Sequence, residues 1–305
     1  MSWQSKLACW LLRRQFRPET LKPVIDPAHA RKLVARRMRM PRRAPLGWRL
    51  RGEWLERTDG ASKRLLLYFH GGGYYFCSPV THRPLVFALT KRAGVRSFSL
   101  DYRLAPEHRF PAALDDALAA YRAVLAQGTP PESIVFGGDS AGGGLALATL
   151  VALRDRGEPL PAGAILFSPW TDLAATGETL RSNDGLDPMF AGAALGRAAR
   201  LYLGDTPGTH PHASPLYADF TGLPPLFIQA GSTEVLLDDA RRVAAKARAA
   251  GVKVEMEIWP DLPHVWQIGV PFLPEAGQAL DRAAAFLRGV ALERATQRTA
   301  EASIA

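Results

Sequence analysis

Residues 138–142 read Gly-Asp-Ser-Ala-Gly, a pentapeptide that can make a serine hydroxyl nucleophilic. An apolar run at 134–136 precedes it and a helix-forming run from Gly143 to Leu153 follows it. This is the order of strand, sharp turn and helix that the motif requires. Glycines flank the turn because a side chain there would collide with the neighbouring strand and helix. The pattern predicts that Ser140 attacks a carbonyl carbon and is acylated.

A second glycine-rich motif supplies the complementary chemistry. Residues 70–73 read His-Gly-Gly-Gly and directly follow the apolar run 65–69. Attack on a carbonyl leaves a negative oxygen, and backbone N–H groups aimed at that oxygen stabilise the transition state. Glycine allows such a loop to approach the substrate closely. We therefore predict an oxyanion hole formed by the N–H groups of Gly71, Gly72 and Ala141, the residue after the nucleophile.

Acylation of Ser140 also requires a base that accepts its proton. With this kind of nucleophile turn, the base is a histidine that follows both the serine and the acid in the chain. His264 fits because it lies a few residues after the apolar run 254–259. His210 and His212 form a His-x-His pair without a third zinc ligand nearby, so we interpret them as part of a turn.

The base in turn requires a carboxylate that orients it. We expect this acid just past the strand predicted at 226–230, where Glu234 stands on the following loop. Asp238 is the second candidate, one turn later at the start of the next predicted helix. A carboxylate is favoured there by the helix dipole alone, which explains Asp238 without a catalytic role. The predicted triad is therefore Ser140, Glu234 and His264.

Strand-like and helix-like runs alternate through most of the chain and can position these residues. Strands are predicted at 47–57, 65–69, 95–100, 134–136, 164–167, 226–230 and 254–259, and helices at 79–92, 112–126, 143–156, 237–250 and 275–290. Most strand runs are apolar without alternation, which is typical of a parallel sheet covered by helices on both faces. The fold class is therefore α/β, with a mostly parallel central sheet flanked by helices.

Two stretches break this alternation. Residues 1–45 look helical, basic and punctuated by proline, and residues 170–223 contain many turn formers without a convincing strand. An insertion at 170–223 would sit at the carboxyl end of the sheet, over the reactive serine. We predict that the two stretches form a helical cap on a single domain that spans residues 1–305.

The formal charge of +9 is concentrated near the N-terminus. Residues 1–64 hold 17 Lys and Arg against 5 Asp and Glu, a balance of +12, whereas the other 241 residues carry −3. The segment opens with a basic amphipathic helix that includes Trp3, Lys6, Trp10 and Arg13. Two interpretations are open: weak contact with an anionic membrane surface, or a lid helix whose basic face is solvated, which we favour. No motif for nucleic-acid binding accompanies the charge.

The remaining composition excludes several other classes of protein. Cys9 and Cys77 provide neither a disulfide framework nor metal-ligand spacing, so we expect a reduced cytoplasmic setting. No run approaches the roughly 20 apolar residues of a membrane-spanning helix. Neither the dinucleotide fingerprint nor the phosphate-binding loop motif occurs, which argues against a dinucleotide-dependent oxidoreductase.

The chain resembles the bacterial hormone-sensitive-lipase-like esterases, a branch of the α/β hydrolases. The matching segments are residues 70–73, 101–107, 138–142 and 263–264, in the order that the family uses. The resemblance implies the α/β-hydrolase fold with a cap, and hydrolysis of small-molecule carboxylic esters of short to medium acyl length without cofactor or metal. Family members often dimerise, so a homodimer is an open expectation. The family most often has aspartate where Glu234 stands.

Two alternatives use the same residues. Amide or carbamate hydrolysis requires the same nucleophile, base and oxyanion donors. A non-catalytic small-molecule receptor could be built on the same fold, because a fold does not dictate a function. The receptor is disfavoured because serine, histidine and a suitable carboxylate are all present.

Overall fold

A central sheet organises the computed structural model, which describes residues 1–37, 44–46, 50–55 and 64–302. Its strands are β1 (Ala44–Leu46), β2 (Leu50–Leu55), β3 (Leu65–Phe69), β4 (Arg96–Leu100), β5 (Ile134–Asp139), β6 (Gly163–Phe167), β7 (Leu226–Gly231) and β8 (Val254–Trp259). Over these described residues, the eight strands are ordered β1-β2-β4-β3-β5-β6-β7-β8. Strands β3 to β8 are parallel, whereas β1 and β2 pair antiparallel. The predicted mostly parallel sheet is confirmed.

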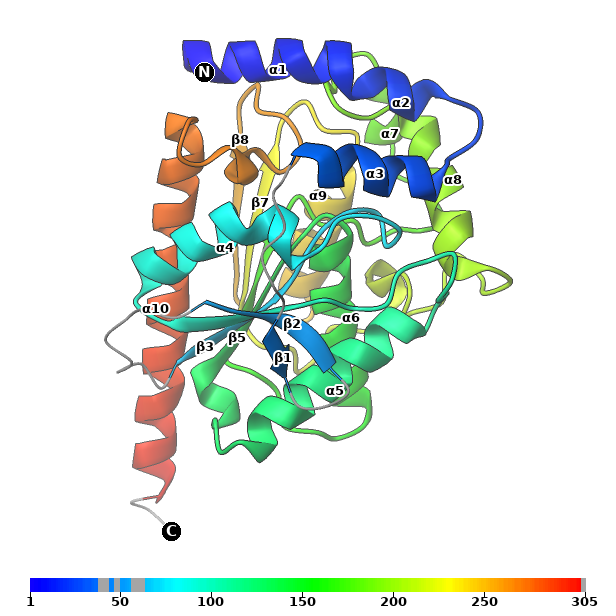
Figure 1. Cartoon of the computed structure of the whole chain (residues 1–305). Coiled ribbons are helices and arrows are strands. Elements are labelled where there is room, and N and C mark those ends of the chain that lie inside the picture. The colour runs from blue at the N-terminus through cyan, green and yellow to red at the C-terminus, as the bar shows by residue number, and fades with distance from the viewer. Residues whose placement is uncertain (38–43, 47–49, 56–63, 303–305) are drawn as a thin grey trace.

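Helices cover both faces of the sheet (Figure 1). They are α1 (Trp3–Gln15), α2 (Arg17–Leu21), α3 (Pro27–Arg37), α4 (Pro79–Ala93), α5 (Ala112–Ala126), α6 (Ala141–Asp155), α7 (Thr179–Ser182), α8 (Gly192–Leu203), α9 (Leu237–Ala249) and α10 (Pro274–Ala302). Short 3₁₀ helices lie at η1 (Pro131–Ser133), η2 (Pro215–Tyr217) and η3 (Trp266–Gly269). The closing helix, predicted to end at residue 290, continues to Ala302.

The core explains why the strand sequences are continuously apolar. Leu65, Leu67 and Phe69 of β3 pack in a cluster with side chains of α5, α6 and α9. Leu66 and Tyr68, which point to the opposite face, pack with side chains of α4 and α10. All five side chains are fully buried. Successive residues of a strand face opposite sides of the sheet, so a strand covered on both sides has no solvent-facing position.

The strand order places the predicted site residues at one edge of the sheet. Parallel strands end at the same edge, and β3, β5, β7 and β8 each lead directly into a segment that the sequence analysis selected. The segment after β3 is residues 70–73, and Ser140 follows β5. Glu234 follows β7 and His264 follows β8. Ligands of α/β sheets bind at this carboxyl edge.

Only part of the two stretches predicted to form a cap lies above the carboxyl edge of the sheet. Helices α1, α2 and α3 lie above the carboxyl edge of the sheet, with α7 and α8 beside them (Figure 1). Residues 38–43 lie outside the described residues, and 44–46 form β1, so that end of the predicted cap belongs to the sheet. Part of the segment 204–223 contacts the C-terminal end of α6. There Arg154 donates hydrogen bonds to the carbonyls of Asp219 and Thr221. The cap predicted from about residues 1–45 and 170–223 therefore stays a prediction.

The strand predicted at 47–57 is only partly within the described residues. Residues 47–49 and 56–57 lie outside them, and the described part forms β2. Among the helices of the described chain, none has the combined length and hydropathy that a membrane span requires.

Candidate active site

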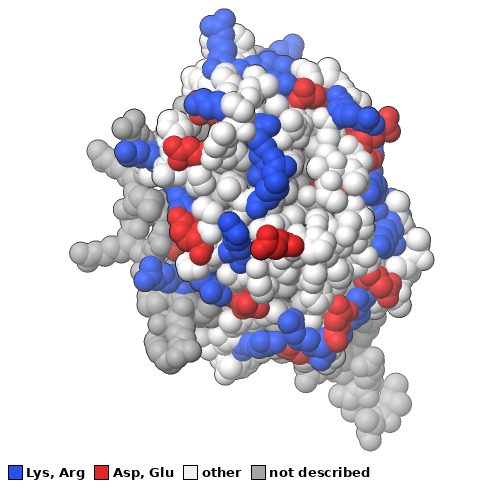
Figure 2. All heavy atoms as spheres, turned by 90° about the vertical axis from the view of Figure 1, so that its right-hand side faces the viewer, with Lys and Arg blue, Asp and Glu red and all other residues white. Residues whose placement is uncertain are grey.

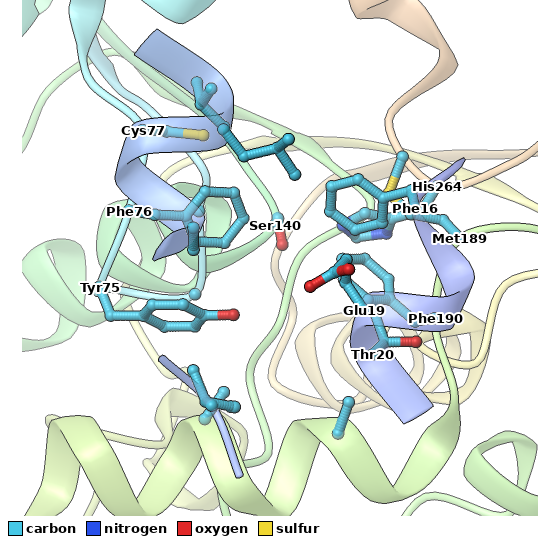
Figure 3. Close-up of a pocket in the computed structure, with 18 of the residues that line it drawn as sticks. Phe16, Glu19, Thr20, Tyr75, Phe76, Cys77, Ser140, Met189, Phe190 and His264 are labelled. Carbon is cyan, nitrogen blue, oxygen red and sulfur yellow. The ribbon is translucent and has the colours of Figure 1, made fainter. Parts of the chain in front are cut away.

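Ser140 occupies a strained turn between β5 and α6. Its backbone φ is 53° and its ψ is −123°, a region that residues with a side chain rarely adopt. Its N–H donates to the carbonyl of Phe167 at 2.8 Å, and its carbonyl accepts from the N–H of Trp170 at 2.9 Å. These bonds hold the strained backbone, as is common at functional turns. The hydroxyl points into a pocket (Figure 3).

The glycines around Ser140 are required by close backbone approaches. A Cβ on Gly138 would lie 2.2 Å from the carbonyl oxygen of Gly142. A Cβ on Gly142 would lie 2.0 Å from the carbonyl oxygen of Phe69 on the neighbouring strand. Both separations are far shorter than a carbon–oxygen contact allows. The steric reason that the sequence analysis gave for these glycines is confirmed.

The structure brings Glu234 and His264 together. His264 Nδ1 lies 2.9 Å from Glu234 Oε2, although the residues are 30 positions apart. Glu234 is fully buried and His264 is 3% exposed. Within the described residues, His264 Nε2 has no hydrogen-bond partner. Both His264 and Ser140 line the same pocket, so this nitrogen is available to the serine hydroxyl or to a bound substrate.

A serine that the sequence analysis missed connects the acid to the histidine loop. Ser168 Oγ donates to Glu234 Oε1 at 2.7 Å and accepts from the N–H of Val265 at 3.1 Å. The N–H of Gly231 donates to the same carboxylate oxygen at 2.5 Å. With one oxygen held in this way, the other is directed at the imidazole. The available signal was position, because Ser168 directly follows β6 at the carboxyl edge of the sheet.

Electrostatics at His264 favour its protonated form. Burial of the imidazole disfavours the charge, but the hydrogen bond and the negative charge of Glu234 outweigh burial. The pKa of His264 is therefore raised above its ordinary value. An imidazole of this kind accepts a proton readily and is stabilised once it is charged.

Asp238, the second candidate for the acid, and its neighbour Asp239 are occupied elsewhere. Asp238 Oδ2 accepts a hydrogen bond from the N–H of Glu178 at 3.1 Å. Asp239 Oδ2 accepts from the N–H groups of Thr171 and Asp172 at 2.7 and 2.8 Å, and burial raises the pKa of Asp239 to about 7. Both carboxylates therefore stabilise the segment that follows β6. The structure places Glu234 against the histidine, not Asp238.

One predicted oxyanion donor needs correction. The N–H of Gly71 donates to Asp139 Oδ1 at 3.0 Å, so it is not available to a substrate. Gly72 and Gly73 line the pocket instead, with φ values of 113° and 57°. In the described part of the chain, their N–H groups donate to no backbone or side-chain acceptor. Gly73 therefore replaces Gly71 as a candidate donor beside Gly72, while Ala141 presents the first N–H of α6.

Asp139 ties this glycine loop to the helix α4. Besides Gly71, its carboxylate accepts from Tyr68 Oη at 2.8 Å and lies 3.1 Å from His82 Nε2. His82 Nδ1 contacts Thr81 Oγ1 at 2.7 Å, and Thr81 forms the capping box that begins α4. Burial opposes the charge of Asp139, but His82 and the hydrogen bonds from His82 and Tyr68 lower its pKa. The network holds the nucleophile turn and the glycine loop in one fixed arrangement.

We expect His82→Ala to lower kcat by about tenfold to a hundredfold with little change in KM, because the oxyanion donors lose their support. His82→Gln keeps a donor near Asp139 and is expected to recover part of the loss. The measurement is steady-state kinetics on a p-nitrophenyl ester, with Lys91→Ala, an exposed position of α4, as the control. A change confined to KM, or unchanged kinetics in folded His82→Ala, would contradict this role.

The pocket around Ser140 is predominantly apolar and measures about 520 Å³. Figure 3 shows the aromatic and sulfur-containing side chains that surround the serine: Phe16, Tyr75, Phe76, Cys77, Met189 and Phe190. Phe190 contacts the His264 ring at 5.0 Å between centroids, and Phe16 contacts Phe190 at 5.7 Å. Residues from 16 to 34 and from α8 form walls of this cavity. Such a surface can accommodate an apolar acyl or alkyl group.

Metal ligation finds no support in the described residues, which contain no group of three or more His, Cys, Asp and Glu side chains arranged to hold an ion. His212, which the sequence analysis placed in a turn with His210, contacts Asp155 Oδ2 at 2.8 Å. His210 packs against Phe110 at 5.0 Å between ring centroids. The pair therefore stabilises the segment after α8, away from the pocket.

Known proteins share this arrangement of the chain. A family model described as the α/β hydrolase fold matches residues 66–268. An acetyl-hydrolase of Streptomyces hygroscopicus is 50% identical over 238 residues, which cover 77% of this chain and 79% of that protein. An esterase of Acinetobacter venetianus is 39% identical over 246 residues, which cover 80% of each protein.

The similarity extends to solved structures. The crystal structure of an esterase from the bacterial hormone-sensitive lipase family aligns with a TM-score of 0.88 and 42% sequence identity. The alignment covers 95% of this chain and 99% of that one. This chain therefore belongs to the α/β hydrolases, in the branch of the bacterial hormone-sensitive-lipase-like esterases.

Proposed function

We propose that this protein is a serine carboxylesterase that hydrolyses esters of short to medium acyl length through an acyl-enzyme on Ser140. The observation that carries the proposal is the buried pair of His264 and Glu234, 2.9 Å apart, in the pocket that Ser140 lines. The relatives named acetyl-hydrolase and esterase support the same reaction class. The family supports the activity, and the geometry supports this choice of residues.

In the acylation step, Ser140 Oγ forms a bond to the ester carbonyl carbon while His264 Nε2 takes the hydroxyl proton. The carbonyl oxygen becomes negative and accepts hydrogen bonds from the N–H groups of Gly72, Gly73 and Ala141. The start of α6 adds a favourable helix dipole at the same place. Collapse of this intermediate breaks the bond to the alcohol oxygen, and His264 returns the proton to the leaving alcohol.

Deacylation repeats these steps with water. His264 Nε2 takes a proton from the water as the water oxygen attacks the acyl carbon, and the same N–H groups stabilise the second oxyanion. The bond to Ser140 Oγ then breaks, Ser140 regains its proton, and the carboxylic acid leaves. Throughout both halves, Glu234 stabilises the imidazolium and fixes Nδ1–H as the donor to its own carboxylate.

A panel of p-nitrophenyl esters tests this function. We expect kcat/KM to be highest among the acetate, butyrate and hexanoate esters and to be much lower for the palmitate, in line with the relatives named acetyl-hydrolase and esterase. The matched p-nitroanilides are expected to react far more slowly. Faster turnover of the anilides would indicate an amidase, and absence of any turnover by folded protein would leave a receptor on the same fold.

A further inference from the structure

The helix α1 presents most of its large apolar side chains to solvent rather than to the protein. Trp3, Leu7 and Trp10 are 70%, 47% and 48% exposed. They recur at intervals of four and three residues, so they lie on one face of the helix. A lid helix that packs on the core would bury this face and expose its charges. The interpretation favoured from the sequence, a solvated basic face, therefore describes α1 incompletely.

Polar contacts attach α1 to the rest of the molecule and account for this orientation. The hydroxyls of Ser2 and Ser5 donate to Glu275 Oε2 at 2.8 and 2.9 Å, and Ser5 is fully buried. The backbone N–H of Ser2 donates to the other oxygen of Glu275. At the other end, Arg13 donates to the carbonyls of Gly185 and Leu186. Ser5 and Ala8 are on the inward face, which is held by these polar contacts, and the two tryptophans are left outside.

Charge around the exposed tryptophans is positive. The sequence of α1 contains Lys6, Arg13 and Arg14 and no acidic residue. The guanidinium of Arg14 lies over the Trp10 ring, 4.4 Å from its centroid. Figure 2 shows Lys and Arg side chains projecting at the top of the molecule, the end at which α1 lies. Exposed tryptophan side chains beside Lys and Arg, on a helix that lies along the protein surface, are typical of segments that bind the headgroup region of anionic bilayers.

We propose that α1 docks on the surface of an anionic lipid bilayer. Trp3, Leu7 and Trp10 enter the headgroup region, and Lys6 and Arg14 contact lipid phosphates. The binding is peripheral and reversible, because one short amphipathic helix buries too little apolar area for permanent attachment. The proposal concerns where the protein is held and does not depend on the reaction at Ser140.

Docking through α1 brings the pocket wall close to the lipid. Phe16, directly after α1, lines the pocket and contacts Phe190. Two further apolar side chains follow on the same part of the chain, Leu21 at 59% exposed and Val24 at 75% exposed, and Val24 lines the pocket. Esters dissolved in a bilayer would therefore reach the cavity with little passage through water.

Flotation with lipid vesicles tests the proposal on the full chain. We expect association with vesicles of equal parts phosphatidylcholine and phosphatidylglycerol, and little association with pure phosphatidylcholine. Raising the salt from about 0.05 M to about 0.5 M is expected to weaken the association, because exposed charges are screened. Trp3→Ser/Trp10→Ser is expected to weaken it by about tenfold or more, and Lys6→Gln/Arg14→Gln to weaken it on the anionic vesicles.

Matched variants separate the α1 face from general surface effects. Phe87→Ser removes an aromatic side chain that is 50% exposed on α4, and Lys91→Gln/Arg241→Gln removes two exposed charges from α4 and α9. Both controls are expected to float like the unchanged protein. Light scattering and a short-chain ester assay accompany each variant. The proposal would be overturned if the unchanged protein did not float, or if Trp3→Ser/Trp10→Ser floated as well as the unchanged protein. It would also be overturned if the unchanged protein were a dimer that Trp3→Ser/Trp10→Ser dissociates, because a second copy would then cover α1.

Discussion

Replacing Ser140 with alanine is expected to lower kcat for p-nitrophenyl butyrate by about 10⁴-fold or more while the protein remains folded. The hydroxyl oxygen is the atom that becomes acylated, and alanine lacks it. The alanine keeps a Cβ, so the strained backbone at φ 53° gains no new side-chain conflict. The measurement combines steady-state rates with a thermal unfolding curve.

A pocket variant is the control for Ser140→Ala. Cys77 lines the same cavity without a role in the proposed chemistry, and burial raises the pKa of its thiol to about 12. Cys77→Ala is therefore expected to keep kcat within about threefold. A fluorophosphonate should add one phosphonyl group to the unchanged protein and to Cys77→Ala, but none to Ser140→Ala. Hydrolysis by Ser140→Ala at more than about a tenth of the original rate would exclude Ser140 as the nucleophile.

Helices and strands that are set by the local pattern of apolar and polar residues could be predicted from the sequence. The strand 65–69 and the helix 112–126 have the predicted boundaries, because each is an uninterrupted apolar or helix-forming run that ends at turn residues. Glu234 and His264 were selected for the same kind of reason. Each stands just past a strand, and parallel strands deliver such positions to one edge of the sheet.

The features that the sequence could not provide depend on contacts between distant residues. The N–H of Gly71 is occupied by Asp139, 68 positions away, and nothing in either motif shows which glycine N–H remains available. The orientation of α1 is set by Glu275, 270 positions from Ser5. Strand β1 has three residues with a proline, too short for periodicity, and forms by pairing with β2. Such contacts override local preference.

Glu234→Gln is expected to reduce kcat by about 10²- to 10⁴-fold. The amide has nearly the same shape but carries no charge, so it no longer stabilises the imidazolium that forms in each transition state. Its NH₂ group can also face Nδ1 and impose the tautomer that protonates Nε2. Asp238→Asn is the matched control, because Asp238 contacts Glu178 rather than His264. We expect that variant to stay within about threefold of the original rate.

The pH profile distinguishes an electrostatic role of Glu234 from a merely structural one. The free enzyme is active only while His264 is neutral, so kcat/KM falls as the pH drops through the pKa of His264. Glu234 raises that pKa against the opposing effect of burial, which places the fall above the ordinary value of about 6.5. Glu234→Gln removes the largest of the effects that oppose burial, so the fall should move to lower pH while the plateau decreases. An unmoved profile in Glu234→Gln, or a shifted one in Asp238→Asn, would show that the carboxylate facing His264 in solution is not Glu234.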